Sequence, residues 1–318
     1  MQARGRIMQR SEIILGKQNW KSKHIVVIGI GGTGCSVAQL LARYGITLTL
    51  MDRDIVEEHN LERQVLFNKS DVGKPKVMAA QEKLKEFCDC SVFFEDVNED
   101  TLPSIFDDKK NKKIDLIIDC TDNNETRLII NDFCKKKKIP WMYSGAVEQK
   151  GAFAFIQPQE ACFQCFTEEK QGETCSEVGV LNSTVSAIAS FVVQAAIEYL
   201  ASGKYDKDLF FLNLKTKKIT HAKINKNKDC RACKGFYDYL EGRKTKKIIK
   251  LCGNEKFAFQ LGKDIDLKSM EKKLSGQKTK RSAYALQSDD FLIFSHGRIV
   301  VNAKTKEEAK KKFDEYVG

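Results

Sequence analysis

A glycine-rich loop, Gly29-Ile30-Gly31-Gly32-Thr33-Gly34, constrains the fold of this 318-residue chain more than any other feature. The loop follows an apolar run at 24–30 and precedes an amphipathic helical pattern at 35–43. Backbone without side chains lets phosphate groups approach the N–H groups at a helix N-terminus. Gly29, Gly31, Gly32 and Gly34 are therefore predicted to bind the phosphates of a nucleotide.

The chain around this loop alternates between two patterns as far as residue 145. Runs rich in Ile and Val at 47–51, 91–97, 114–119 and 141–146 are separated by helical patterns at 76–87 and 127–136. Such alternation is typical of βαβ units. We expect an α/β fold with a Rossmann-like twisted, mostly parallel sheet and flanking helices, in which the segment 151–156 pairs antiparallel at the far side.

The second half of the chain predicts a buried helix and a separate small domain. Residues 181–200 are apolar on nearly every face but carry Asn182, Gln194 and Glu198, so we interpret them as a core helix and predict no membrane span. After residue 235, short strand-like pieces surround one helical pattern and a second helix closes the chain. The predicted domains are residues 1–235 and a small α+β appendage, residues 236–318, of unknown role.

The overall composition favours anionic partners but does not choose among them. The formal net charge is +11, with the lysines spread along the chain. ATP, an acidic carrier protein and RNA all fit such a charge. The N-terminus has no apolar core of signal-peptide length, so the protein is expected to be cytoplasmic.

Asp52 follows the second predicted strand, about twenty residues after the loop. An acidic side chain at this place can accept hydrogen bonds from a ribose. With these features alone, an NAD-dependent dehydrogenase remains a fair alternative.

The residues beyond Asp52 favour phosphate chemistry. They place two cations and several polar groups just past the ribose-binding position: Asp54, Asn60, Arg63, Gln64 and Lys76. Displacement at an α-phosphate develops negative charge that fixed Arg and Lys donors stabilise, whereas hydride transfer has no need of them. The set therefore predicts an ATP site.

Four segments together resemble the motif series of the ThiF/MoeB/HesA adenylating enzymes. They are GIGGTGC, MDRDIVEEHNLERQ, VGKPK and DCTDNNETRLIIND, and the resemblance covers roughly residues 7 to 235. It implies that Asp52 holds the ribose hydroxyls, that Arg63 and Lys76 contact the phosphates, and that Asp122 binds Mg²⁺ or orients the attacked phosphate. Arg127 is expected to anchor its helix.

The resemblance also implies an oligomer. Arg10, in RSEIILG, resembles the family arginine that reaches ATP from the partner subunit. We therefore expect a homodimer whose sites are completed in trans.

Two CxxC pairs, Cys162/Cys165 and Cys230/Cys233, predict a structural zinc site. Thiolates two residues apart can occupy adjacent corners of a tetrahedron, and two such pairs close it. Four sulfur ligands leave no open position, so the Zn²⁺ would pin the two segments together. Buried cysteines without a metal are the alternative.

Cys175 lies ten residues beyond Cys165, just before the predicted core helix. Related enzymes carry a cysteine here, and in some it forms a thioester or acyl-disulfide with the activated carrier protein. A reactive thiolate needs exposure and a lowered pKa, which a helix N-terminus can supply. Covalent catalysis and an inert thiol both remain open.

The resemblance implies ATP-dependent adenylation of the C-terminal glycine carboxylate of a ubiquitin-like or sulfur-carrier protein that ends in Gly-Gly. A second hypothesis is adenylation of a carboxylate on tRNA, as in the threonylcarbamoyl-adenosine cyclising enzymes. A third is a non-catalytic subunit of an activating complex. Arg63, Lys76 and Asp122 together argue against the third, because a scaffold does not need phosphate-handling charges.

Overall fold

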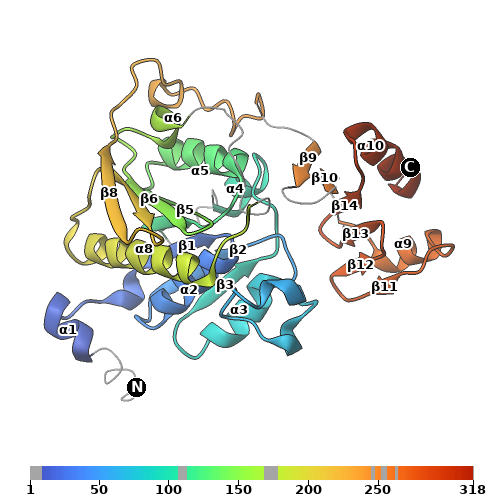
Figure 1. The fold of residues 1–318 in the computed structure, drawn as a ribbon, viewed down its shortest axis with the longest axis horizontal. Helices are drawn as coiled ribbons and strands as arrows, with labels where there is room; N and C mark the ends of the chain where they lie inside the picture. Colours follow the sequence, from blue (N-terminus) through green and yellow to red (C-terminus); the bar gives the residue numbers. More distant parts are fainter. Residues whose placement is uncertain are drawn as a thin grey trace.

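Two β-sheets organise the structure, a computed structural model that describes residues 9–106, 113–167, 178–244, 248–251, 256–261 and 264–317. A larger unit holds an eight-stranded sheet, and a smaller unit at the C-terminal end holds a six-stranded one (Figure 1).

The larger sheet has the strand order β3-β2-β1-β4-β5-β6-β7-β8. Its first five strands run parallel: β1 (His24–Ile28), β2 (Thr47–Met51), β3 (Cys90–Phe93), β4 (Leu116–Asp119) and β5 (Trp141–Val147). The last three are antiparallel to their neighbours: β6 (Lys150–Ile156), β7 (Asp208–Asn213) and β8 (Lys218–Lys223). The expected Rossmann-like sheet, including the antiparallel pairing of the segment 151–156, is confirmed.

Helices cover both faces of this sheet, so its central strands are apolar on both sides. In β1, Ile25 and Val27 join one core with α2 (Gly32–Ala42), α3 (Lys76–Leu84) and α8 (Asn182–Ser202). Val26 and Ile28 join the opposite core with α4 (Thr101–Phe106) and α5 (Asn124–Lys137). All five residues of β1 are buried, which explains the unbroken apolar run from Ile25 to Ile28.

The helix α8 is long and apolar enough to cross a membrane, judged by length and composition. Instead it packs against α2, β5 and β6, and half of its most apolar stretch is buried inside the larger unit. The core helix expected at 181–200 is therefore present.

The smaller sheet is antiparallel, in the order β11-β12-β13-β14-β10-β9. Its strands are β9 (Ile248–Leu251), β10 (Lys256–Gln260), β11 (Lys280–Arg281), β12 (Ala285–Gln287), β13 (Phe291–Phe294) and β14 (Arg298–Asn302). The helices α9 (Leu267–Lys273) and α10 (Lys306–Val317) pack on one face. The boundary at residue 235 stays a prediction, and Tyr239 and Leu240 just beyond it pack into the larger unit.

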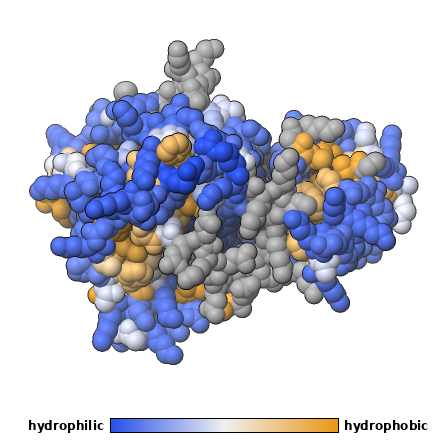
Figure 2. All heavy atoms as spheres, turned by 90° about the horizontal axis from the view of Figure 1, so that it is seen from above, coloured by the Kyte–Doolittle hydropathy of each residue, from blue (hydrophilic) through white to orange (hydrophobic). Residues whose placement is uncertain are grey.

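The other face of the smaller sheet contacts the larger unit. Ala258, Ala285, Phe294 and Val300 form a buried cluster with Ile55, and Phe94 packs against it. The two units lie side by side in Figure 2, whose visible surface is mainly hydrophilic with separate small hydrophobic patches. The apolar contact at Ile55 brings the C-terminal unit close to the carboxyl end of β2.

Candidate active site

The glycine loop joins the end of β1 to the start of α2, and two of its glycines are required by close backbone approaches. Gly29 has φ +86°, and a Cβ there would lie 2.9 Å from the carbonyl of Cys120. A Cβ at Gly34 would lie 1.9 Å from the Gly29 carbonyl oxygen. A Cβ at Gly32 would lie 3.1 Å from Val185, whereas one at Gly31 would meet open space. The loop is thus packed tightly on the end of β4.

Asp52, directly after β2, is bonded to this loop. Its Oδ2 accepts a hydrogen bond from the Ile30 amide at 2.5 Å, and its Oδ1 accepts one from the Asp54 amide at 2.7 Å. Burial raises the pKa of Asp52, and the nearby Lys76 cation only partly offsets that rise. The carboxylate therefore lies beside the loop, where the sequence predicted it.

Asp54 and Lys76 form an ion pair next to Asp52. The Lys76 ammonium lies 3.3 Å from Oδ2 of Asp54, and the Lys76 amide donates to the Asp54 carbonyl at 2.9 Å. Burial alone would raise the pKa of Asp54, but the cations of Lys76, Arg298 and Arg53 together lower it. Two of the residues expected to handle phosphate chemistry are thus in direct contact.

The segment between them holds the remaining polar residues of the motif. Asn60 is buried, and its Oδ1 accepts a hydrogen bond from the Glu57 amide at 3.4 Å, which caps a short 3₁₀ turn. Gln64 is also buried, and its Oε1 has no hydrogen-bond partner among the described residues. Arg63 keeps 27% of its side chain exposed and donates to the His59 carbonyl at 3.1 Å.

Arg63 also lies close to the loop through its backbone. Its carbonyl oxygen would be 3.4 Å from a Cβ at Gly32. The side chain of Asn182, at the start of α8, donates to the neighbouring Glu62 carbonyl at 3.3 Å. The Arg63 segment is therefore held between the glycine loop and α8.

Asp122 is exposed between β4 and α5, one residue before the helix N-cap Asn123. Its charge acts on both Arg53 and Arg127 and helps to raise the pKa of each. Arg127 is buried and contacts Asp119 at 3.2 Å, together with the carbonyls of Thr121 and Ser144. These contacts tie α5 to two strands, as expected of a structural anchor.

Two arginines near the site were not singled out in the sequence. Arg53 contacts Asp96 at 2.9 Å, and Arg298 of β14 contacts Oδ1 of Asp54 at 2.7 Å. Arg53 lies inside the MDRD motif, so its position offered a signal. Arg298 lies 244 residues from Asp54 and offered none.

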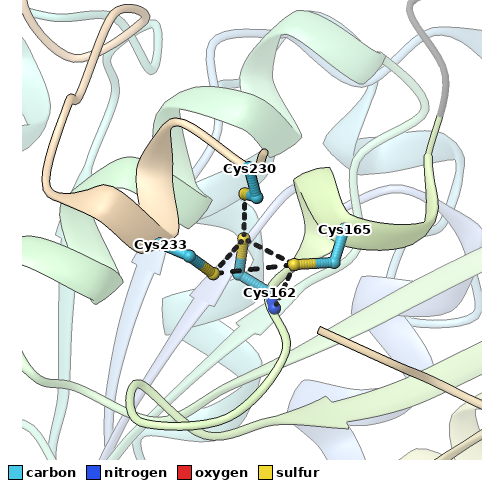
Figure 3. A group of neighbouring side chains, drawn as sticks. All are labelled: Cys162, Cys165, Cys230 and Cys233. Carbon is cyan, nitrogen blue, oxygen red and sulfur yellow. Dashed lines mark hydrogen bonds between the residues drawn. The ribbon is translucent and has the colours of Figure 1, made fainter. Parts of the chain in front are cut away.

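The four predicted zinc ligands come together in one cluster (Figure 3). Cys162 and Cys165 come from the turn at α6 (Phe163–Phe166), and Cys230 and Cys233 from the 3₁₀ turn near residue 232. Four of the six sulfur–sulfur distances are 3.5, 3.5, 3.6 and 3.8 Å, close to the edge of about 3.8 Å that a tetrahedron with Zn–S bonds of about 2.3 Å requires, and all four sulfurs lie within 4.8 Å of one another. The donor set therefore fits a tetrahedral metal ion.

Two other predicted residues stand apart from this geometry. Cys175 lies outside the described residues, so its role stays a prediction. Arg10 is exposed on α1 (Gln9–Leu15), which Figure 1 shows at the edge of the larger unit, on the side away from the C-terminal sheet.

Comparison with known proteins identifies the family. The model of the ThiF family matches residues 6–232. The chain belongs to the ThiF family. The relatives of this ThiF-family chain include the sulfur carrier protein ThiS adenylyltransferase of Bacillus subtilis (strain 168), 28% identical over 325 residues and 95% of each chain. The molybdopterin-synthase adenylyltransferase of Escherichia coli (strain K12) is 30% identical over 69% of this chain and 90% of its own.

Solved structures share a similar fold with this chain. A crystal structure of E. coli MccB with MccA-N7isoASN superimposes with a TM-score of 0.63, at 20% sequence identity, over 71% of this chain and 74% of that chain. At this identity the likeness concerns the fold alone.

Proposed function

We propose that this protein uses ATP to adenylate the C-terminal glycine carboxylate of a ubiquitin-like or sulfur-carrier protein. The observation that carries the proposal is the group formed by Asp52, Asp54 and Lys76 directly beside the glycine loop. The relatives named as adenylyltransferases support the same reaction. An NAD oxidoreductase has no use for a buried lysine at this place.

The residues take separate roles in this reaction. Asp52 accepts hydrogen bonds from the ribose, while the glycine loop, Lys76 and Arg63 contact the phosphates. The carrier carboxylate attacks the α-phosphorus, the bond between that phosphorus and its bridging oxygen breaks, and pyrophosphate leaves. Because the nucleophile is already ionised at neutral pH, the protein contributes mainly orientation and stabilisation of charge.

Two metal ions belong to the proposal. Asp122 is the residue proposed to hold Mg²⁺, which would neutralise charge on the triphosphate when bound. A structural Zn²⁺ at Cys162, Cys165, Cys230 and Cys233 would join the segment after β6 to the segment after β8. Its sulfur ligands fill all four positions, so it takes no part in the reaction.

We further propose a homodimer in which Arg10 reaches the partner subunit's ATP. Its helix α1 supports this role, because Ile13 and Ile14 are 82% and 84% exposed next to it. Adjacent large apolar side chains with this much solvent exposure are typical of surfaces that a partner covers. The protein is predicted to act in the cytoplasm, where no membrane partner is expected.

The fate of the adenylate is a separate question. Cys175 is proposed as a first acceptor, whose thiolate would attack the acyl carbon and release AMP. Transfer to a sulfur donor on another protein is the alternative. A reducible carrier adduct that is absent from Cys175→Ala distinguishes the two.

ATP–pyrophosphate exchange with candidate carriers ending in Gly-Gly tests the proposed function. Exchange is expected only with a carrier, and Arg63→Ala and Asp122→Ala should abolish it. Arg43→Ala and Asp314→Ala are matched controls, because both residues are exposed and lie outside the site. If no carrier gives exchange while tRNA stimulates ATP consumption, the hypothesis of adenylation on tRNA replaces the proposed adenylation of a carrier protein.

A further inference from the structure

Arg298 reaches from the C-terminal unit into the nucleotide site. It is the first residue of β14, and only 3% of its side chain is exposed. Its Nη1 lies 2.7 Å from Oδ1 of Asp54, and its guanidinium carbon lies 5.5 Å from the centre of the Phe294 ring. The Phe294 contact and the small sheet hold the side chain in this direction.

Asp54 is therefore shared between two cations on different parts of the chain. Its Oδ2 pairs with Lys76 of α3, and its Oδ1 pairs with Arg298 of β14. The amide of Asp54 is bonded in turn to Asp52. A change at Arg298 is thus two contacts away from both the predicted ribose carboxylate and the predicted phosphate lysine.

The buried environment of Arg298 is unfavourable for a cation, so docking the two units does not explain why an arginine is there. Burial and the positive charge of Arg53 lower the pKa of Arg298, and its Nε is buried without a hydrogen-bond partner among the described residues. The guanidinium is desolvated, whereas 43% of the Asp54 side chain is exposed, so solvent weakens the attraction that would offset this desolvation. The apolar contact between Ile55 and the small sheet is already present to join the units.

We propose that Arg298 is a positioning residue for the nucleotide, which holds the Asp54 carboxylate so that Lys76 stays directed at the phosphates. Because Arg298 is a second counter-ion of Asp54, the carboxylate stays paired and in place when Lys76 contacts ATP. The C-terminal unit is then part of the ATP site and not only an appendage. This inference rests on the proposed function, because it assigns the site to ATP.

The test compares Arg298→Gln with Arg281→Gln in the full-length protein. Arg281 offers a matched control, because it lies on the same small sheet and pairs with Glu271 at 2.6 Å at the surface. ATP affinity is measured directly with a fluorescent ATP analogue, and KM values for ATP and for carrier come from pyrophosphate exchange. Thermal unfolding of each variant reports on folding.

We expect Arg298→Gln to weaken ATP binding about ten-fold or more, which corresponds to about 1.4 kcal/mol, because the Asp54 carboxylate that orients Lys76 loses its fixed partner. The KM for carrier should stay within about two-fold, because the lost contact acts on Lys76. Arg281→Gln should bind ATP like the unchanged protein. Arg298→Lys, which keeps the charge but loses the planar fork, should recover part of the affinity.

Equal ATP affinity in Arg298→Gln and Arg281→Gln would overturn the inference. So would parallel changes in the KM values for ATP and carrier, since a structural role predicts a general loss. If Arg298→Gln does not fold, Arg298→Lys alone decides the matter, because unchanged ATP affinity there contradicts a positioning role. A protein that binds no ATP at all refutes the proposed function instead, so the two failures are distinguishable.

Discussion

The Nζ atom of Lys76 lies 3.3 Å from Oδ2 of Asp54, at the first turn of α3. Burial alone would lower the pKa of Lys76, but the carboxylates of Asp54 and Asp52 raise it above its ordinary value. Lys76 is therefore a fixed cation before any nucleotide arrives. A charge that is already oriented needs no rearrangement when phosphate charge develops.

Replacing Lys76 by methionine should lower the rate of pyrophosphate exchange about 100-fold or more, the loss typical of removing one fixed charge-stabilising group. Lys83→Met is the matched control, because Lys83 lies on the same helix and pairs with Asp71 at 2.7 Å. The rates are compared at saturating ATP and carrier. Full activity in Lys76→Met would show that this lysine does not stabilise the leaving phosphates.

The two glycines Gly34 and Gly31 should respond differently to alanine. Gly34→Ala forces a Cβ to within 1.9 Å of the Gly29 carbonyl oxygen, so a large fall in the melting temperature is expected. A Cβ at Gly31 meets nothing within 4 Å, so Gly31→Ala should fold normally but bind ATP more weakly, because the methyl group occupies phosphate space. A stable Gly34→Ala protein would mean that the loop is looser than described.

His296 predicts a loss of stability in mild acid. Burial, together with the positive charge of Arg298, lowers its pKa from 6.5 to about 4 against the raising effect of three carboxylates, Asp96, Asp264 and Asp54. Both ring nitrogens are buried without a partner among the described residues. The unfolded chain therefore binds a proton between pH 6.5 and 4 that the folded chain does not.

The stabilisation from neutral His296 is complete above pH 6.5 and is lost as the pH falls through about 4. The difference corresponds to about 3 kcal/mol. His296→Phe keeps the ring contacts with Phe94 and Phe294 and should make the free energy of unfolding less sensitive to pH in this range. Urea unfolding at several pH values measures this free energy. If it depends on pH equally in His296→Phe and in the unchanged protein, the buried neutral state of His296 is contradicted.

The cysteine cluster predicts one zinc per chain. Purified protein should release zinc to a chelator with a fall in melting temperature, and Co²⁺ substitution should give the absorption of a tetrahedral four-sulfur site. Cys233→Ser should lose the metal, whereas Cys90→Ser, outside the cluster, should keep it. If protein without zinc has an unchanged melting temperature, the four cysteines are reduced thiols that hold no structural metal.

Much of the larger fold follows from local sequence, because strands buried on both faces are continuously apolar. The segment 47–51 was predicted with the bounds of β2, but the strand expected at 91–97 ends at Phe93. The chain leaves the sheet there, so that Phe94 contacts the small unit and Asp96 pairs with Arg53. Those contacts are tertiary and leave no periodic signal.

Two strands of the larger sheet were not predicted at all. The edge strand β8 (Lys218–Lys223) is exposed at every residue, so it has no buried face to produce an alternating pattern. Its neighbour β7 (Asp208–Asn213) is only partly buried. Edge strands with charged residues are common in stable proteins, because they discourage pairing between chains.

In the site, as in the fold, features with a local sequence signal were predicted and features that depend on tertiary contacts were not. Glycine, aspartate and lysine spacing indicated a nucleotide site, and the structure brings Asp52, Asp54 and Lys76 together as neighbours. Arg298 was missed because its partner lies far away in the sequence, and its importance depends on how two sheets dock. A buried arginine at a strand start carries no motif of its own.

The most direct test of adenylation is the intact mass of a Gly-Gly carrier after incubation with the protein, Mg²⁺ and ATP, stopped in acid before the adenylate hydrolyses. We expect the carrier to gain the mass of an adenylyl group, which is AMP less one water, and a carrier without its terminal glycine to remain unmodified. An unmodified carrier under conditions in which ATP is bound, or AMP attached elsewhere than the C-terminus, would contradict the account.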